Sequence, residues 1–276
     1  MAAMNEPVRG TGTPIGIDTV EGRGDGELAS WREALAAVCA RTTLFQTSTV
    51  LAEVASTQDA PETRNAHAGA LVTTLRQTQG RGRFGRTWDD TAEAGVAVTF
   101  VIDAQPSERL VLASAVAAAE ACERSLGRRV GIKWPNDVVV GGLKLCGVLI
   151  ERRDSRALVG IGINVLQTSF PEPLASRATS LALLGAPVHR IEVLTALVEA
   201  LDRALVASDE TLVGAFLERD ALRGQRALFA TPEGPVEGEV RSIDPMRGLV
   251  VRTEAGERFL PAGSTSVAEW AGRPAR

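Results

Sequence analysis

The sequence predicts an α+β protein with a mixed β-sheet, followed by a small all-β module at the C-terminal end. Strand-like and helix-like segments are interspersed as far as Arg223, which favours packed layers of both elements. Two glycines at 141–142, between apolar segments, predict an antiparallel hairpin. After Arg223 only short alternating segments remain, which is typical of a small β-barrel. We expect a disordered leader at 1–27, a main domain at 28–223 and the β module at 224–276.

Each element of this prediction rests on hydrophobic spacing and on the turn residues that bound it. The leader is rich in Gly, Pro, Thr and charge without periodicity, and helical spacing begins at Leu28. Helices are expected at residues 28–40, 110–126, 191–208 and 210–219, with a short one capped by residues 56–59 and ending near 68. Strands are expected at 50–55, 71–75, 96–102 and 157–165, at three segments between 130 and 151, and at 227–229, 236–243, 248–253 and 257–260.

Composition excludes several classes of protein. The 276 residues are 45% hydrophobic and 23% charged, which is ordinary for a chain that buries a full core. A net charge of −4 argues against a surface built for nucleic acid. No apolar run approaches the roughly 20 residues that a membrane span requires. We therefore expect neither DNA nor a membrane among its partners.

Cysteine usage and the N-terminal region predict a cytoplasmic protein. Cys39, Cys122 and Cys146 are scattered, so they indicate neither a disulfide framework nor a metal-ligand spacing. The N-terminal region has no compact apolar core of a signal peptide.

There is room for only one helix before the first strand, whereas a helix-turn-helix module needs several. We therefore expect no DNA-binding domain.

Residues 76–88 form the densest cluster of functional side chains. Their glycines can take φ > 0 and let the backbone approach a ligand closely. Their arginines offer planar forks of donors that suit phosphate or carboxylate, and Trp88 adds a flat apolar face for an aromatic base. The segment therefore predicts a loop that binds an anion. Its glycines are Gly80, Gly82 and Gly85, and its arginines after Gln77 are Arg81, Arg83 and Arg86.

Other phosphate-binding and catalytic motifs fit poorly. The glycines at 80, 82 and 85 match the dinucleotide fingerprint formally, but Arg-Thr-Trp-Asp-Asp follows them where a helix should open. The chain has no Gly-x-x-x-x-Gly-Lys phosphate loop, no Gly-x-Ser-x-Gly elbow and no zinc-like His/Cys cluster. His67 and His189 sit in polar surroundings typical of solvated surface groups.

A second cluster lies between residues 133 and 151. Asn136 and Asp137 follow a proline and present polar side chains at a strand edge. Lys144 lies among glycines and apolar strand residues. Such a lysine either extends into solvent without a role or holds an anion as a mobile point charge.

Together the two clusters resemble the signatures of the biotin–protein ligase family. Residues 80–88 match Gly-Arg-Gly-Arg-x-Gly-Arg-x-Trp, and residues 133–151 match Lys-Trp-Pro-Asn-Asp…Gly-x-Lys-x-x-Gly-x-Leu-x-Glu. A Gly-Ile-Asn element recurs at 162–164, so the resemblance spans about residues 50–165. The C-terminal β module is similar to the family's SH3-like domain. The short N-terminal region resembles the monofunctional members, which lack a DNA-binding domain.

This resemblance implies a two-step ligation. Biotin and ATP, with Mg²⁺, would give biotinyl-5′-AMP and pyrophosphate. A lysine of the biotin-carrier domain of a carboxylase would then take the biotinyl group. Three glycines and exposed arginines give the loop at 76–88 little to pack on, so we expect it to be mobile when empty and to close over the adenylate.

The resemblance also implies roles for individual residues. Lys144, Arg81 and Arg83 would be catalytic, and Asp137 would hold metal or the acceptor lysine. Gln58 stands where the family has Asn. The biotin-binding residues would be Ser56, Thr57, Gln58, Gln77, Arg81, Gly82, Arg83, Lys144 and Gly147. The nucleotide-binding residues would be Arg81, Arg83, Arg86, Trp88, Asn136, Lys144 and Asn164.

Two other functions compete with this one. Lipoate–protein ligases and octanoyltransferases share the fold and the lysine acceptor, but they lack the arginine-rich loop signature. A biotin-responsive regulator or carrier-binding module without turnover belongs to a different class. The complete catalytic motifs weigh against that reading.

Overall fold

The computed structural model describes residues 20–88 and 93–270. Its main feature is a seven-stranded sheet in the order β1-β2-β5-β9-β8-β7-β6. β1 and β2 run parallel and the other neighbouring pairs are antiparallel, so the predicted mixed sheet of an α+β fold is confirmed. The strands are β1 (Thr47–Val54), β2 (Ala70–Gln77), β5 (Gly95–Asp103), β6 (Gly131–Lys133), β7 (Asp137–Val140), β8 (Leu143–Arg153) and β9 (Arg156–Asn164).

Helices cover one face of this sheet. α3 packs against α4 and against β8 and β9, and α1 packs against β1 and α4. Much of α3 is buried alanine, whose small side chains allow close packing. None of the helices in the described ranges is long and apolar enough to cross a membrane. The helices are α1 (Val20–Cys39), α2 (Pro61–Asn65), α3 (Ser107–Leu126), α4 (Arg190–Val206) and α5 (Asp209–Leu217).

The other face of the sheet is kept bare by glycine. Successive strand residues point to opposite faces. On β9, Ile161 and Ile163 are buried in the helix-covered core, so Gly160 and Gly162 between them face the other way. The paired position on β8 is also glycine, Gly147. The uncovered face therefore has a patch without side chains of its own.

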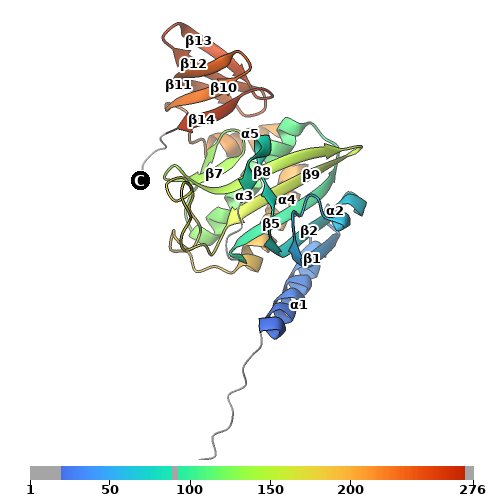
Figure 1. Ribbon diagram of the computed structural model, residues 1–276. Coiled ribbons are helices and arrows are strands. Elements are labelled where there is room, and N and C mark those ends of the chain that lie inside the picture. The colour runs from blue at the N-terminus through green and yellow to red at the C-terminus, as the bar shows by residue number, and fades with distance from the viewer. Residues whose placement is uncertain (1–19, 89–92, 271–276) are drawn as a thin grey trace, which may run out of the picture.

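The C-terminal segment forms a second sheet of five antiparallel strands, set at one end of the molecule in Figure 1. Its order is β13-β12-β11-β10-β14, and the two outer strands are not paired with each other. The expected closed barrel is therefore an open sheet in hydrogen-bonding terms. The strands are β10 (Arg226–Thr231), β11 (Gly234–Asp244), β12 (Gly248–Thr253), β13 (Gly256–Pro261) and β14 (Ser266–Trp270).

Three elements differ from the sequence-based expectation. Residues 20–27, assigned to the disordered leader, form the first turns of α1, while residues 1–19 lie outside the described part of the chain. The short helix after β1 begins at Pro61, and Ser56 lies in the turn before it without capping it. β14 was not expected, because none of its residues is fully buried and no apolar alternation marks it.

Candidate active site

The arginine-rich loop is folded into a small hairpin. β3 (Gly80–Arg81) pairs with β4 (Thr87–Trp88), and the Gly82 amide donates to the Arg86 carbonyl at 2.7 Å. Gly85 has a φ of 71°, the left-handed conformation that glycine adopts without strain. The expectation that this loop has little to pack on was wrong, because Trp88 lies against the sheet.

Trp88 rests on the bare glycine patch. A Cβ atom added at Gly162 would lie 2.7 Å from the indole Nε1 of Trp88, closer than real contacts allow. A Cβ at the paired Gly147 would lie 2.9 Å from Nζ of Lys144 and 3.2 Å from the Trp88 ring. Glycine at both positions thus lets an aromatic ring and a lysine lie directly over the backbone.

Lys144 is held over this patch from three sides. Its Nζ lies 2.7 Å from the Asp137 carboxylate and 5.5 Å from the centre of the Trp88 ring. Its backbone amide donates to Arg177 and its carbonyl accepts from Thr179, at 2.8 and 2.9 Å. The lysine that was open to two interpretations is therefore fixed beside the loop rather than extended into solvent.

Asp137 joins the only two lysines in the sequence. The chain has 28 arginines but only Lys133 and Lys144 as lysines, and Lys133 lies 3.0 Å from the second oxygen of the same carboxylate. Burial would raise the pKa of Asp137. The ammonium groups of Lys144 and Lys133, with their hydrogen bonds, outweigh burial and lower this pKa below its ordinary value.

Arg83 is linked through Asn136 to β8, the strand that carries Lys144. Its Nη1 donates to the Asn136 side-chain oxygen at 3.2 Å, and the Asn136 amide donates to the Val148 carbonyl at 2.6 Å. Burial lowers the pKa of Arg83, Asp137 opposes this effect and Arg86 adds to it. A partly desolvated guanidinium of this kind interacts more strongly with an anion than one in bulk water.

The Asn164 side chain hydrogen-bonds to backbone carbonyl groups. Its side-chain amide donates to the Thr179 carbonyl at 3.0 Å and to the Lys144 carbonyl at 3.4 Å. It thereby ties the end of β9 to the strand that carries Lys144.

A buried cluster of neutral polar side chains, called the polar cluster below, lies at the ends of β1 and β2. The side-chain oxygen of Gln77 accepts from the Thr57 amide at 2.9 Å, and Thr99 donates to the Thr57 hydroxyl at 2.9 Å. Ser56 is buried beside them. The Gln58 side chain lies over Gly160, where a Cβ would come within 2.9 Å of it. These neutral donors and acceptors suit an uncharged polar group rather than an ion.

Arg81 points toward carboxylates at the far end of the patch. It contacts Asp59 at 3.1 Å and Glu151 at 2.9 Å, and Arg153 also contacts Asp59. Glu151 is four residues along β8 from Gly147, about 13 Å at the rise of a strand. Arg81 is therefore not grouped with Lys144 and Arg83 in this structure, and Arg86 is exposed.

The structure brings most of the predicted residues to one face. One end is formed by Lys144, Asp137, Asn136, Arg83 and Trp88, and the other by the polar cluster of Thr57 and Gln77. Sequence reasoning missed several contributors, although glycines two apart in a strand are a signal of close approach. Those missed are Asp59, Thr99, Lys133, Glu151, Gly160, Gly162 and residues 177–179.

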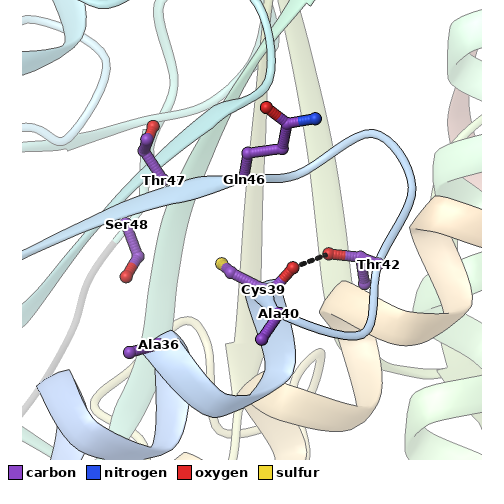
Figure 2. Close-up of a pocket in the computed structure, with 7 residues that line it drawn as sticks. All are labelled: Ala36, Cys39, Ala40, Thr42, Gln46, Thr47 and Ser48. Carbon is purple, nitrogen blue, oxygen red and sulfur yellow. Dashed lines mark hydrogen bonds between the residues drawn. The ribbon is translucent and has the colours of Figure 1, made fainter.

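A separate cavity of about 630 Å³ lies where α1 ends and β1 begins (Figure 2). It is lined by small and neutral side chains, and the Thr42 hydroxyl donates to the Cys39 carbonyl within it at 3.1 Å. None of the predicted site residues lines it. Its lining residues are Ala36, Cys39, Ala40, Thr42, Gln46, Thr47 and Ser48.

Metal-ligand chemistry is not evident at the site. Within residues 20–88 and 93–270, no three His, Cys, Asp or Glu side chains gather closely enough to hold a metal ion. Both carboxylate oxygens of Asp137 face lysine ammonium groups. The donor set around Asp137 therefore does not fit a resident cation.

Comparison with known proteins agrees with this geometry. Residues 48–167 match the model of the biotin/lipoate A/B protein ligase family. The biotin–[acetyl-CoA-carboxylase] ligase of Mycobacterium tuberculosis is 31% identical over 208 residues, which cover 71% of this chain and 77% of that protein. The bifunctional ligase/repressor BirA of Bacillus spizizenii is 32% identical, over 70% of this chain but only 64% of its own length.

A solved structure extends the likeness to three dimensions. The biotin protein ligase of Aquifex aeolicus, in complex with biotin and ATP, is 31% identical, with a TM-score of 0.73. The match covers 82% of this chain and 100% of that chain. The chain therefore belongs to the biotin/lipoate A/B protein ligase family, as one of its biotin protein ligases.

Proposed function

We propose that this chain is an ATP-dependent ligase that converts biotin into biotinyl-5′-AMP and transfers the biotinyl group to a lysine of a biotin-carrier domain in a carboxylase. The observation that carries the proposal is the position of Lys144. It lies over a glycine patch between an aromatic ring and Asp137, on the face that also bears the buried polar cluster. A ligand with a neutral polar head, a carboxylate and a nucleotide would place these three parts, in that order, against the polar cluster, Lys144 and the aromatic ring.

The polar cluster would hydrogen-bond to the fused ring of biotin. A ureido group has both donors and acceptors and no charge, as do Ser56, Thr57 and Gln77. Gln58 would line the same end from above Gly160. Gly82 and Gly147 would let the backbone approach the biotin chain.

The cations would bring two anions together. In the first step a biotin carboxylate oxygen attacks the α-phosphorus, the bond to the β-phosphate oxygen breaks, and pyrophosphate leaves. Lys144 and Arg83 would offset the repulsion between carboxylate and phosphate and stabilise charge on the phosphate oxygens. Arg81 and Arg86 would support carboxylate and phosphates from the hairpin. Asp137 would orient Lys144, which its position between the two lysines supports.

The nucleotide would lie beside the hairpin. Trp88 offers an aromatic face for adenine, and Asn136 and Asn164 lie next to the strand of Lys144. Mg²⁺ would arrive bound to the ATP phosphates as part of the substrate, where it shields their charge.

The second step is an acyl transfer. The carrier lysine amine attacks the carbonyl carbon of the mixed anhydride, the bond from that carbon to the phosphate oxygen breaks, and AMP leaves as the amine gives up a proton. The product is an amide.

Residues 28–223 would perform both steps, and residues 224–276 would be an SH3-like module despite its open sheet. Three unpaired cysteines fit a reducing cytoplasm.

One assay tests the proposal against its rivals. The protein is incubated with ATP, Mg²⁺, the biotin-carrier domain of an acyl-CoA carboxylase, and either biotin or lipoate. We expect biotin-dependent pyrophosphate release and one biotinyl group on the carrier, with none on a carrier whose acceptor lysine is replaced by arginine. Labelling with lipoate alone would favour the lipoate ligase, and biotin binding without pyrophosphate release would favour a regulator.

A further inference from the structure

Arg190 is a buried charge outside every site described above. Its side chain is 6% exposed, and it occupies the first position of α4. The helix dipole disfavours a cation at a helix N-terminus, and burial of a guanidinium is costly without partners. A cation at this position therefore does not stabilise α4, and the reason for its burial must lie in the groups that it contacts.

Those partners come from three separate elements. One guanidinium nitrogen, Nη1, donates to the Leu75 carbonyl at 2.7 Å and to the Gly95 carbonyl at 3.3 Å. The other, Nη2, lies 2.7 Å from the Glu27 carboxylate of α1. The guanidinium carbon also stacks 4.9 Å from the ring centre of Trp31 in α1. Arg190 thus joins α1, β2 and β5 at a single point.

The two carbonyls mark the place where two strands separate. The ladder between β2 and β5 ends at the pair Thr74–Ala97. Leu75 and Gly95 lie just beyond it, where the chain leaves β2 toward Gln77 and the hairpin and where it enters β5. Arg190 supplies hydrogen bonds that the ladder no longer makes at this fork.

We propose that Arg190 is a positioning residue for the ligand hairpin, residues 77–88. Its Nη1 binds both strand ends and so fixes their separation, while α1 holds the guanidinium through Glu27 and Trp31. Gln77 lies two residues beyond Leu75, so movement of the fork displaces the polar cluster directly. Gly95 pairs with Asn164, which links the fork to the backbone of Lys144.

Substitution of Arg190 by lysine separates the positioning role from the general effect of a buried positive charge on stability. Arg190→Lys keeps the charge, but a single ammonium cannot hold both carbonyls and Glu27 in the arrangement of a planar fork. Arg219→Lys is the matched control. Arg219 is 7% exposed and pairs with Glu123 at 2.8 Å, on the α5 side of the molecule away from the fork. Both variants should lose similar global stability.

The first measurement uses no ligand. Limited trypsin digestion of the folded protein, followed by mass spectrometry, gives the rate of cleavage after Arg81, Arg83 and Arg86. We expect Arg190→Lys to raise this rate about tenfold, because loss of one charge-assisted hydrogen bond favours local opening. Arg219→Lys should leave the rate unchanged. Equal rates in wild type and Arg190→Lys, or an equal rise in Arg219→Lys, would overturn the proposal.

The second measurement rests on the proposed function. In biotin-dependent pyrophosphate release, Arg190→Lys should raise KM for biotin about tenfold while kcat changes less than about twofold. A fall in kcat at unchanged KM contradicts a positioning role. Glu27→Gln should raise hairpin cleavage in the same direction by a smaller factor, and no change would remove α1 from the proposal. Inactive wild-type protein would refute the proposed function, whereas the ligand-free digestion still decides the role of Arg190.

Discussion

Trp134 and Pro245 connect the two sheets: the indole Nε1 donates a hydrogen bond to the Pro245 carbonyl oxygen, 3.2 Å away. Trp134 is fully buried and lies with Asn136 in the turn between Lys133 of β6 and Asp137 of β7. The turn that follows β11 in the C-terminal sheet therefore contacts the proposed nucleotide end of the site through the Trp134 side chain.

Trp134→Phe should weaken this connection without opening a large cavity. The Pro245 carbonyl would lose its partner, which costs about 1–3 kcal/mol for a buried group. We expect a lower Tm and a higher KM for ATP, measured by calorimetry and pyrophosphate release. Trp270→Phe is the control, since the Trp270 Nε1 has no hydrogen-bond partner among the described residues. Equal effects of the two variants would contradict the connection.

Lys144→Ala should abolish adenylate formation while the fold remains. Loss of one group that stabilises transition-state charge lowers kcat by about two to three orders of magnitude. The side chain is 37% exposed and Asp137 keeps Lys133, so the circular dichroism spectrum and Tm should change little. Biotin-dependent exchange of labelled pyrophosphate into ATP is the measurement. Retained exchange would remove Lys144 from its proposed role.

Gly162→Ala should displace Trp88 from the sheet. The new Cβ would overlap the indole, so the hairpin must move. We expect weaker biotin and ATP binding by calorimetry, with a near-normal Tm. Gly214→Ala in α5, where a Cβ meets nothing within 4 Å, is the control, and it should stabilise the protein by about 0.5–1 kcal/mol. Unchanged binding by Gly162→Ala would show that the glycine patch has no steric role.

Asp137→Asn should reduce stability in a pH-dependent way. The folded-state pKa of Asp137 lies below the ordinary value of 3.8, so its contribution is fully present above that value and is lost as pH falls through the folded pKa. We expect a loss of about 1–3 kcal/mol at pH 7, less than for a fully buried pair because both lysines are partly exposed. Urea unfolding from pH 3 to 8 should show a constant difference above about pH 5 that shrinks in stronger acid. A difference that grows toward acid would contradict the ion pairing.

The rate at which a thiol reagent modifies the cysteines should report unfolding rather than the reactivity of exposed thiols. Burial raises the pKa of Cys122 to about 12 and that of Cys146 well above 9.0, and burial also raises the pKa of Cys39. A raised pKa leaves little thiolate at pH 8. We expect Cys122 and Cys146, both 0% exposed, to react with a disulfide reagent at the rate of global unfolding, followed by absorbance. Fast reaction of either of these two thiols in the folded protein would contradict their burial.

The sequence predicted the sheet and the main helices because buried faces impose regular spacing. It also predicted the hairpin at Gly141 and Gly142, whose φ values of 58° and 84° fit such a turn. β14 was missed because a strand without a fully buried residue lacks an apolar period, and the start of α1 was missed because residues 20–27 are rich in Gly and charge. Arg81 illustrates a different limit. Its residue type predicts an anion partner, but only the fold shows that Asp59 and Glu151 are the anions beside it.

The pairing of both lysines with Asp137 has a consequence for the protein's own chemistry. A mixed anhydride of biotin acylates any free amine it meets, and arginine is no acceptor because its guanidinium stays protonated. This chain has only two lysine amines, and both are held in ion pairs. The protein's own lysines should therefore resist labelling by its intermediate, and the carrier lysine should react in preference to them.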